Sequence, residues 1–423
     1  MSFDNFCKTK LCRIAEVQTG PFGSQLHKSD YVDVGTPIIT VEHLGKRKLS
    51  GSQAPLVSDH DWERLSKYHL RKGDLVFSRV GSVDRCSLVS IDEEGWLFSG
   101  RCLRIRPNKK MVDQRYLYYC FCIDKLKEYI RKIAVGATMP SLNTQIMNDL
   151  VLEIHSLREQ KAIAATLSCL DDMIELNNRT NKVLEEMAQA IFKHWFVDFE
   201  FPDENGEPYK SSGGEMVESE LGEIPKGWGI EQFTDIIKVK GGGTPKTGNP
   251  NYWNGEIPFF TPKDCNSNYY VSNTEKQITK LGLEGCNSEL HPTNTVFITA
   301  RGTVGKIAVA GRPMAINQSC YALRYRGETL QYYVHQITKN AVLELQHKAT
   351  GAVFDAIVTR DFDSLTIIMP TTDLIRTYDT TISVAYELMR NNNIYNTILA
   401  QIRDTLLPKL ISGEIRVPVE EVG

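Results

Sequence analysis

One forty-residue stretch without proline or glycine, Leu157 to Phe196, constrains the fold of this chain more than any other feature. Its apolar residues recur at alternating steps of four and three: Ile163, Leu167, Leu170, Ile174, then Leu184, Ala188, Ile191 and Trp195. This spacing is typical of helices that pack side by side along a seam. At 1.5 Å per residue, the seam spans about 48 Å. We therefore expect one long helix packed against a second.

The same pattern returns 215 residues later in the chain. The second seam contains Tyr378, Ile382, Ala385, Met389, Leu399, Arg403, Leu406 and Leu410. Two polar seam positions recur as well, Asn177 and Asn181 in the first copy and Asn392 and Asn396 in the second. A buried asparagine in a helix seam lowers stability but fixes register. We therefore predict that these four residues set the helix–helix register, and that Pro408 ends or kinks the second helix early.

The repeat also extends outside the two helices. Residues 35–40 parallel 255–261, residues 80–85 parallel 301–306, residues 103–106 parallel 323–326, and residues 136–137 parallel 351–352. The repeated unit is therefore a domain followed by a helix, which indicates a duplication and not a solenoid. A length of 423 residues also predicts two or more domains.

The segments before the two helices mix short strand-like runs with turns. Residues 37–41, 74–77 and 103–106 read as strands, the last with one apolar and one basic face, and residues 114–133 read as a helix. We predict an α+β fold with two domains of mixed structure and two long coiled-coil helices, arranged as an internal repeat. The predicted boundaries are 1–155 (first domain), 156–200 (central helix), 201–228 (acidic linker), 229–372 (second domain) and 373–423 (C-terminal helix and tail).

The distribution of charge separates the domains from the rest of the chain. The net charge is −3, yet residues 1–155 carry 23 Lys and Arg against 18 Asp and Glu, and residues 229–372 carry 14 against 12. Residues 202–228 carry 2 against 7, and both helices are net acidic. Positive domains on an acidic scaffold favour two DNA-facing modules.

Composition excludes several other classes of protein. No apolar run approaches the ~18 residues of a membrane helix, and the N-terminus lacks the apolar core of a signal peptide. The ten cysteines are scattered without a CxxC pair, which predicts reduced thiols in a cytoplasm.

Motifs for catalysis are missing. Residues 249–252, NPNY, lack the second proline of the NPPY motif of adenine methyltransferases. Residues 241–247, GGGTPKT, are not a phosphate loop, because Pro245 replaces the glycine before the lysine. The nine histidines form no HxxxH or HExxH pair, and no serine or cysteine triad is recognisable. We expect no catalytic residue, no metal site and no cofactor on this chain.

Four stretches carry a resemblance to a known family. They are GPFGSQL with KSDY (20–26, 28–31), WFVDF with ESELGEIPKGW (195–199, 218–228), GGTP with YWNG, IP and TPKD (242–245, 252–255, 257–258, 261–264), and LLPKLISGEI (406–415). In this order, they resemble the specificity subunit of type I restriction–modification systems over essentially the whole chain.

The resemblance implies a non-catalytic subunit in a bacterial or archaeal cytoplasm. Its two target-recognition domains would be joined by two long antiparallel coiled-coil helices, in a pseudo-twofold internal repeat. Each domain would read half of an asymmetric, bipartite site in double-stranded DNA, while the helices set the spacer and dock two modification subunits. Those subunits would use S-adenosylmethionine to methylate adenine, and restriction subunits would cut DNA with ATP and Mg.

Loop residues near the repeated motifs are the candidates for DNA contact, although an ordinary surface role remains open for each. Arginine and lysine can bind guanine edges or phosphates, and glutamine can pair with adenine. The candidates are Gln25, Lys28, Lys46, Arg47, Arg79, Ser82 and Arg85 in the first domain, and Thr244, Lys246, Lys263, Arg301, Thr303 and Lys306 in the second.

Two alternatives remain open from the sequence. The first is the recognition part of a fused methyltransferase or endonuclease, against which the missing catalytic motifs count. The second is a standalone DNA-binding repressor or decoy built on the same scaffold.

Overall fold

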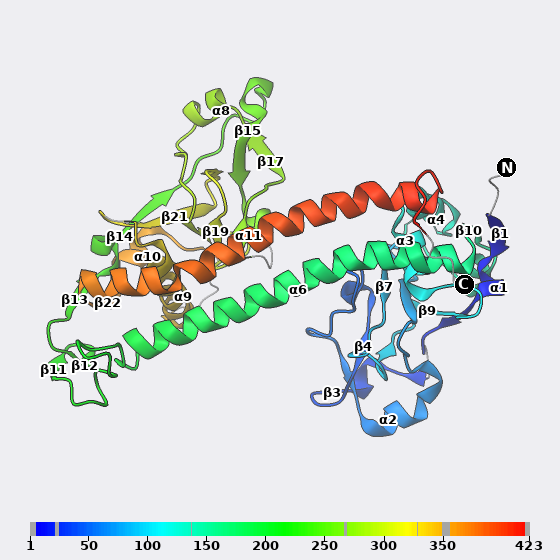
Figure 1. Cartoon of the computed structure of the whole chain (residues 1–423), viewed down its shortest axis with the longest axis horizontal. Helices are drawn as coiled ribbons and strands as arrows, with labels where there is room; N and C mark the ends of the chain where they lie inside the picture. The colour runs from blue at the N-terminus through cyan, green and yellow to red at the C-terminus, as the bar shows by residue number, and fades with distance from the viewer. Residues whose placement is uncertain are drawn as a thin grey trace. The chain divides into compact units, whose positions relative to one another are not determined.

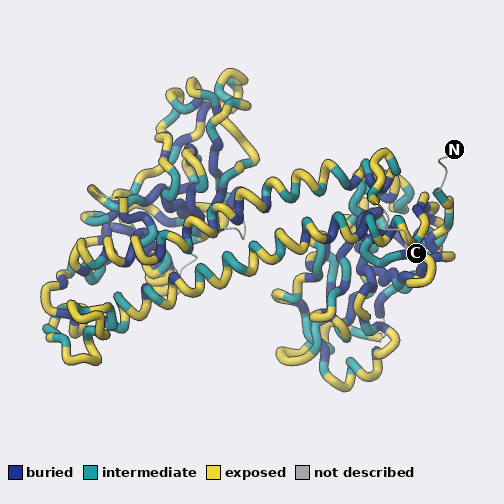
Figure 2. Tube along the Cα trace, in the orientation of Figure 1, coloured by how far each residue is buried: buried dark blue, intermediate teal, exposed yellow. Residues whose placement is uncertain are grey.

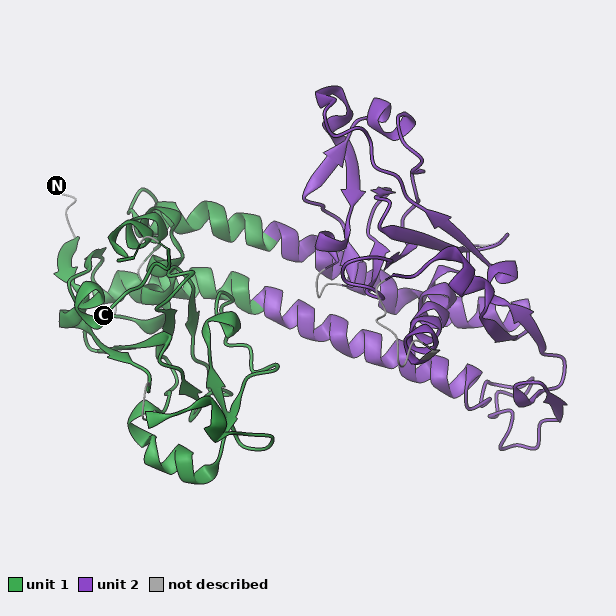
Figure 3. Cartoon of the chain, turned by 180° about the vertical axis from the view of Figure 1, so that it is seen from behind, with its two compact units in different colours: residues 1–172, 399–423 green, residues 173–398 purple. Residues whose placement is uncertain are grey.

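The computed structural model describes residues 6–21, 25–136, 138–265, 269–327, 329–348 and 356–418. The chain divides into two compact units (Figure 3), residues 1–172 with 399–423 and residues 173–398. Both divisions fall inside long helices, whereas the predicted boundaries fall at their ends. This division into two units does not test the predicted domain boundaries, which stay a prediction.

The first unit contains two four-stranded sheets and a two-stranded pair (Figure 1). The antiparallel central sheet has the order β2-β9-β6-β7, formed by Ala15–Thr19, Cys102–Pro107, Leu75–Ser78 and Cys86–Leu88. A second sheet has the order β3-β5-β4-β8, formed by Tyr31–Val32, Leu56–Val57, Thr36–Ile39 and Leu97–Phe98. The ends of the domain meet where β1 (Cys7–Lys10) pairs with β10 (Val151–Ile154). Its helices are α1 (Leu11–Ile14), α2 (Asp59–Arg64), α3 (Gln114–Cys122), α4 (Asp124–Ile133) and α5 (Thr144–Asn148).

The second unit repeats this order of elements. Its central sheet, β14-β21-β18-β19-β16, is formed by Ile237–Gly241, Cys320–Tyr325, Val296–Thr299, Ile307–Ala310 and Tyr270–Val271. A smaller sheet, β17-β15-β20, is formed by Lys276–Ile278, Trp253–Phe260 and Ala315–Ile316. β13 (Gly229–Gln232) pairs with β22 (Thr366–Met369), as β1 pairs with β10. The helices are α7 (Phe233–Ile236), α8 (Lys280–Glu284), α9 (Gln331–Lys348) and α10 (Thr359–Asp363). The α+β fold and the internal repeat are confirmed.

The two long helices begin with equivalent caps. α6 runs from Leu157 to Phe196 and α11 from Thr372 to Ile411. The Ser156 hydroxyl accepts the N–H of Glu159, whose carboxylate accepts the N–H of Ser156 in return. The Thr371 hydroxyl, 215 residues later, accepts the N–H of Leu374. The helices end at residues with positive φ, Phe199 (62°) beyond α6 and Gly413 (74°) beyond α11.

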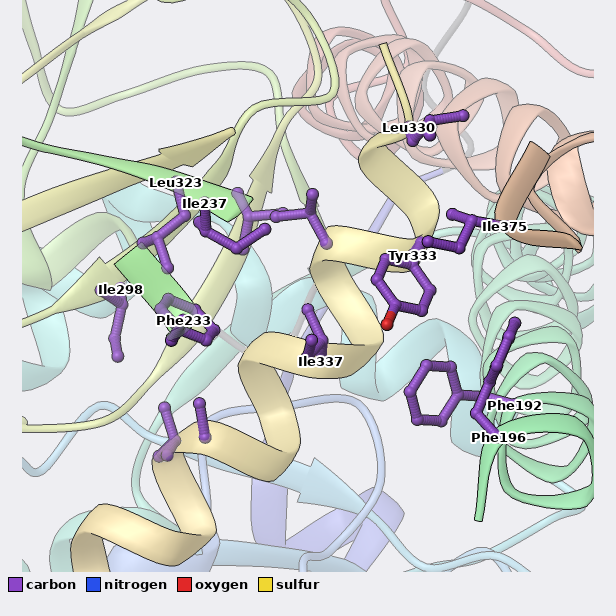
Figure 4. Packing of buried hydrophobic residues seen from close by; sticks show 14 of the residues in the cluster. Phe192, Phe196, Phe233, Ile237, Ile298, Leu323, Leu330, Tyr333, Ile337 and Ile375 are labelled. Atoms are coloured by element: carbon purple, nitrogen blue, oxygen red, sulfur yellow. The ribbon is translucent and has the colours of Figure 1, made fainter. Parts of the chain in front are cut away.

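The helices are part of the hydrophobic core of each unit (Figures 2 and 4). In the first unit, Ile163 and Leu167 of α6 pack with Leu407, Leu410 and Ile411 of α11. In the second unit, Phe192 and Phe196 of α6 face Tyr333 of α9, with ring centroids 5.8 and 5.3 Å apart. Tyr378 of α11 donates to the carbonyl of Ala188, at 3.1 Å. In the first unit the N-terminal part of α6 packs with the C-terminal part of α11, and in the second unit the C-terminal part of α6 packs with the N-terminal part of α11. The predicted antiparallel packing is therefore confirmed.

Three local predictions are wrong in detail. The helix expected over residues 114–133 breaks at Ile123, whose backbone is extended, and Asp124 opens a new helix. α11 continues past Pro408 to Ile411, because Leu410 and Ile411 are buried and hold the last turn in place. The segment 201–228 is not a bare linker, because it forms a hairpin of β11 (Met216–Ser219) and β12 (Gly222–Pro225) and buries Trp228.

Candidate nucleic-acid interface

Equivalent loops leave the central sheet of each domain, after β6 (residues 79–85) and after β18 (residues 300–306). The hydroxyl of Ser78 donates to the carbonyl of Ser82 and accepts the N–H of Arg85 at 3.0 Å. The hydroxyl of Thr299 does the same for Thr303 and Lys306, again with an N–H contact of 3.0 Å. One buried hydroxyl therefore closes each loop at both ends.

The tip of each loop is built on glycine. Gly81 and Gly302 both have φ of +80°, in the left-handed region that other residues adopt at a cost. A side chain added at either glycine would meet no described atom within 4 Å. The tips are therefore open to a ligand while their backbone is constrained.

Backbone hydrogen bonds gather three further segments around the β6–β7 loop. The N–H of Arg79 donates to the carbonyl of Arg101 at 2.9 Å. Ser99 donates to Ile39 at the end of β4 at 2.8 Å, and Gly20 donates to Cys102 at 3.3 Å. A Cβ at Gly20 would lie 2.3 Å from the carbonyl oxygen of Ser99, so this motif position requires glycine.

The second domain makes the same three connections. Ala300 donates to Ser319 at 2.7 Å, Asn317 to Phe260 at 2.9 Å, and Gly242 to Cys320 at 3.2 Å. A Cβ at Gly242 would lie 2.2 Å from the carbonyl oxygen of Asn317. Each domain thus presents one cluster of loops at one end of its central sheet. The GPFG motif of the first domain lies partly outside the described residues, as do Ala137 and residues 351–352.

The predicted DNA-contact residues of the first domain fall into two groups. Five are exposed, namely Gln25, Lys28, Lys46, Ser82 and Arg85, although Gln25 also accepts a hydrogen bond from Tyr68 at 2.7 Å. The other two are engaged within the unit. Arg79 donates to the carbonyls of Leu142 and Gly100, and Arg47 pairs with Asp172 of α6 at 2.5 Å.

All six predicted residues of the second domain are exposed: Thr244, Lys246, Lys263, Arg301, Thr303 and Lys306. Thr244 and Gln318 share a hydrogen bond, which joins the Gly242 motif to the loop that precedes β21. Lys263 lies 3.9 Å from Glu275, and both side chains are largely exposed. Such a surface pair contributes little to stability and leaves the lysine available.

Several exposed polar residues beside the loops were missed from the sequence. Arg101 and Gln318 occupy the loops before β9 and β21 that contact the β6–β7 and β18–β19 loops. The helix α4 carries exposed Lys125 and Lys132, and its Arg131 pairs with Asp84 at 3.2 Å. Only the repeat alignment of residues 99–101 with 317–319 would have singled out the first two.

The basic face predicted for residues 103–106 is not open. Arg104 is 2% exposed and pairs with Glu16 at 2.9 Å. Arg106 pairs with the buried Asp74 through two contacts of 2.8 and 2.6 Å. These arginines neutralise carboxylates within the fold, so they contribute little positive field outside it.

The four seam asparagines contact one another. Asn177 donates to Asn396 and Asn392 donates to Asn181, each at 2.8 Å. Asn396 also donates to Asn178, a partner that the sequence did not suggest, at 2.9 Å. Each asparagine thus bonds to the repeat equivalent of its neighbour four residues away, as expected where two like helices meet about a local twofold axis.

A search of the described residues finds no group of three or more His, Cys, Asp or Glu side chains arranged to hold a metal ion. In the same part of the chain, every helix is too short or too polar to cross a membrane.

The chain is similar to known proteins over most of its length. A family model described as the type I restriction modification DNA specificity domain matches residues 5–186 and 225–374. The MjaIX type I restriction enzyme specificity subunit of Methanocaldococcus jannaschii is 28% identical over 73% of this chain and 71% of its own length. The HindI specificity subunit of Haemophilus influenzae is 25% identical over 83% and 88%. The crystal structure of the type I restriction–modification S subunit from M. genitalium aligns over 97% of this chain and 98% of its own, with a TM-score of 0.57 and 15% identity, and so shares the fold.

Proposed function

Since the chain belongs to the type I restriction–modification DNA specificity family, we propose that it is a specificity subunit whose two domains each read one half of a bipartite DNA site. The observation that carries this proposal is the pair of loop clusters. Both domains present an open, glycine-tipped loop closed by one hydroxyl at the same place in the fold. The chain would determine which DNA sequence the complex acts on and would not itself catalyse the reaction.

The two half-sites differ in sequence, because the loops differ. Ser78 to Arg85 read SRVGSVDR, whereas Thr299 to Lys306 read TARGTVGK. Arg85 is replaced by Lys306, and arginine binds a guanine edge through two donors where lysine acts as a point charge. Asp84 is replaced by Gly305, which removes an acceptor for a cytosine amino group. The recognised site is therefore asymmetric.

The helices set the spacer between the half-sites. Each is forty residues long, which corresponds to about 60 Å. The asparagine bonds fix which residues of α6 face which residues of α11, because a shift by one turn would leave buried amides unpaired. A fixed register gives one spacer length.

The helices also carry a surface for two modification subunits. Exposed apolar residues lie one position before the seam on both helices, at Met173, Leu176, Val183 and Met187 of α6 and at Val384, Leu388, Tyr395, Ile398 and Ile402 of α11. Within each set, successive residues are three, four or seven positions apart. Three residues of the α6 set, Met173, Val183 and Met187, have counterparts 215 residues later in the α11 set, Leu388, Ile398 and Ile402. We name these sets the α6 stripe and the α11 stripe.

The stripes favour helical partners that pack alongside them. Equivalent stripes on the two copies of the repeat fit two copies of one partner. The modification subunits would bring S-adenosylmethionine and flip the target adenine, and the restriction subunits would use ATP and Mg. Neither cofactor is proposed to bind this chain.

Mapping methylated adenines across the host genome, with and without this gene, tests the proposal. We expect a split, asymmetric motif that disappears with the gene.

The purified chain alone, given S-adenosylmethionine and DNA, should transfer no methyl group. Methyl transfer by the chain alone would support the alternative of a fused enzyme. Adding a modification subunit should raise specific affinity strongly, and an unchanged affinity would favour a standalone repressor.

A further inference from the structure

Two adjacent carboxylates on α6 hold the first domain at two separate places. Asp172 Oδ1 lies 2.5 Å from Arg47 Nη1, and Asp171 Oδ2 accepts a hydrogen bond from the Tyr119 hydroxyl, also at 2.5 Å. Arg47 belongs to the loop between β4 and β5, whereas Tyr119 belongs to α3. Two attachment points on different elements add a polar restraint on the orientation of the domain to the hydrophobic packing of Ile163 and Leu167.

One of these carboxylates, Asp171, connects to the second helix. Arg403 of α11 pairs with Asp171 at 2.6 Å and with its neighbour Asp404 at 2.8 Å. Asp171 is 8% exposed, so the contact forms largely out of water, where a charge-assisted hydrogen bond is strong. Arg403 occupies a seam position at which the first helix has Ala188. We name Arg47, Tyr119, Asp171, Asp172 and Arg403 the brace.

The brace is linked to the β6–β7 loop by short connections. The carbonyl of Arg47 accepts the N–H of Leu88 at 2.8 Å, and the carbonyl of Lys46 accepts the Ser87 hydroxyl at 2.6 Å. Both partners lie on β7, which begins immediately after the loop. A change in the orientation of Arg47 is therefore transmitted to the loop proposed to face DNA.

The second unit uses the same helix position with different chemistry. Tyr386 is the repeat equivalent of Asp171, and it is fully buried. Its hydroxyl accepts from Gln336 of α9 at 3.0 Å and lies 3.1 Å from Nδ1 of His335. This helix position therefore fastens the domain to the helix pair in both units, with charges in the first unit and neutral groups in the second.

We propose that the brace residues are positioning residues, which hold the first domain in one orientation on the helix pair so that its half-site is accepted at one spacer length only. The inference rests on the proposed function. It assigns Arg47 to the scaffold, where it acts on recognition through α6, and removes it from the residues that touch DNA.

The test uses the full chain assembled with its modification subunits and duplexes that carry both mapped half-sites. The spacer is varied from one base pair shorter to one base pair longer than the natural length. For Asp172→Asn, at a side chain that is 63% exposed, we expect the preference for the natural spacer to fall about three- to fivefold, the effect expected from losing one partly exposed ion pair. Preference for the half-site bases should stay unchanged. Glu186→Gln is the matched control, because Glu186 forms only an exposed 3.8 Å pair with Lys182.

A charge exchange separates the brace from a DNA contact. The double variant Arg47→Asp with Asp172→Arg restores the ion pair and should recover the natural spacer preference. If the exchange fails to recover it and Arg47→Ala reduces the salt dependence of binding, Arg47 contacts phosphate and the proposal is overturned. An Asp172→Asn variant that keeps full spacer preference overturns it as well. Failure of the wild-type complex to prefer any bipartite site would instead overturn the proposed function.

Discussion

At the residue scale, Ser78 and Thr299 each join both ends of a loop through a single hydroxyl group. Ser78→Ala removes one donor and one acceptor, so the β6–β7 loop gains alternative conformations that must be ordered on binding. Loss of two neutral hydrogen bonds corresponds to about 1–3 kcal/mol. We expect affinity for the first half-site to fall by about ten- to a hundredfold, measured by titration of duplexes mutated in either half. A loss spread equally over both half-sites would contradict this role.

Asp379 gives the second unit a specific dependence on pH. Its carboxylate accepts the N–H of Tyr333 at 2.7 Å, yet burial raises its pKa to about 7. In the unfolded chain the pKa is about 3.9, so the folded state binds the extra proton between these values. Stability from this group is therefore present below about pH 4 and is lost as the pH rises through 7.

Asp379→Asn should remove this dependence, because the amide oxygen still accepts the N–H and carries no charge. We expect the variant to unfold at a temperature about 5 °C higher than the wild type at pH 8, with little difference at pH 4. Scanning calorimetry at several pH values measures this. Burial lowers the pKa of His291 to about 4, so its contribution to stability has the opposite dependence on pH. His291 is present in both the wild type and the Asp379→Asn variant, so its contribution cancels from their difference. A constant difference at all pH values would rule out the titration of Asp379.

Individual contacts were the least predictable part of the candidate interface. The sequence predicted DNA contact for Arg47, Arg79 and Arg85 alike, because all three are basic residues near a repeated motif. In the structure, Asp172 and two backbone carbonyls engage the first two, and Arg85 is exposed. These partners lie between 21 and 125 residues away, and a single sequence contains no signal for such pairs.

At the element scale, the stripes on the long helices make a direct prediction. Val183→Glu combined with Ile398→Glu places charge on both stripes without touching the seam. We expect binding of the modification subunits, measured by gel filtration or calorimetry, to weaken at least a hundredfold, because a buried unpaired carboxylate costs several kcal/mol. Lys182→Gln, on an exposed position of the same helix, should leave assembly unchanged. Normal assembly of the double variant would exclude the stripes as the docking surface.

Helix length offers a second prediction at this scale. Inserting one heptad at equivalent positions of α6 and α11 adds about 10 Å, equivalent to about three base pairs. The spacer of the methylated motif should lengthen while both half-sites keep their bases, as mapped by genome-wide methylation. Altered half-site bases with an unchanged spacer would show that the helices do not measure distance.

The seam was predictable because its heptad spacing depends only on local geometry. Ile163, Leu167, Tyr378 and Ile382 are buried as expected. The residues one position after the seam, such as Phe192 and Tyr386, were not foreseen, because the adjoining domain contributes to their burial: Phe192 contacts Tyr333 of α9 in addition to Tyr378 of the opposite helix. The end of α11 was misjudged for the same reason, since burial of Ile411 outweighs the effect of Pro408.

At the scale of the whole molecule, the duplication predicts that the two domains can be exchanged independently. Replacing residues 1–155 by the equivalent domain of another family member should change one half-site of the methylated motif and leave the other half unchanged. The reason is that the second domain lies outside the replaced segment. Arg47 and Tyr119 of the brace lie inside it, so the spacer should stay the same where the new domain keeps equivalent contacts to Asp172 and Asp171. A change in both halves would show that the domains do not read DNA separately.

The closure of each loop by one buried hydroxyl has a consequence for how this lineage diversifies. Val83 in the first loop belongs to the buried core, whereas the exposed residues between the two anchored ends, such as Ser82 and Thr303, do not, so mutation can substitute these exposed residues without unfolding the strands on either side. Under the proposed function, such substitutions would change one half-site at a time and leave the long helices and their exposed stripes unchanged.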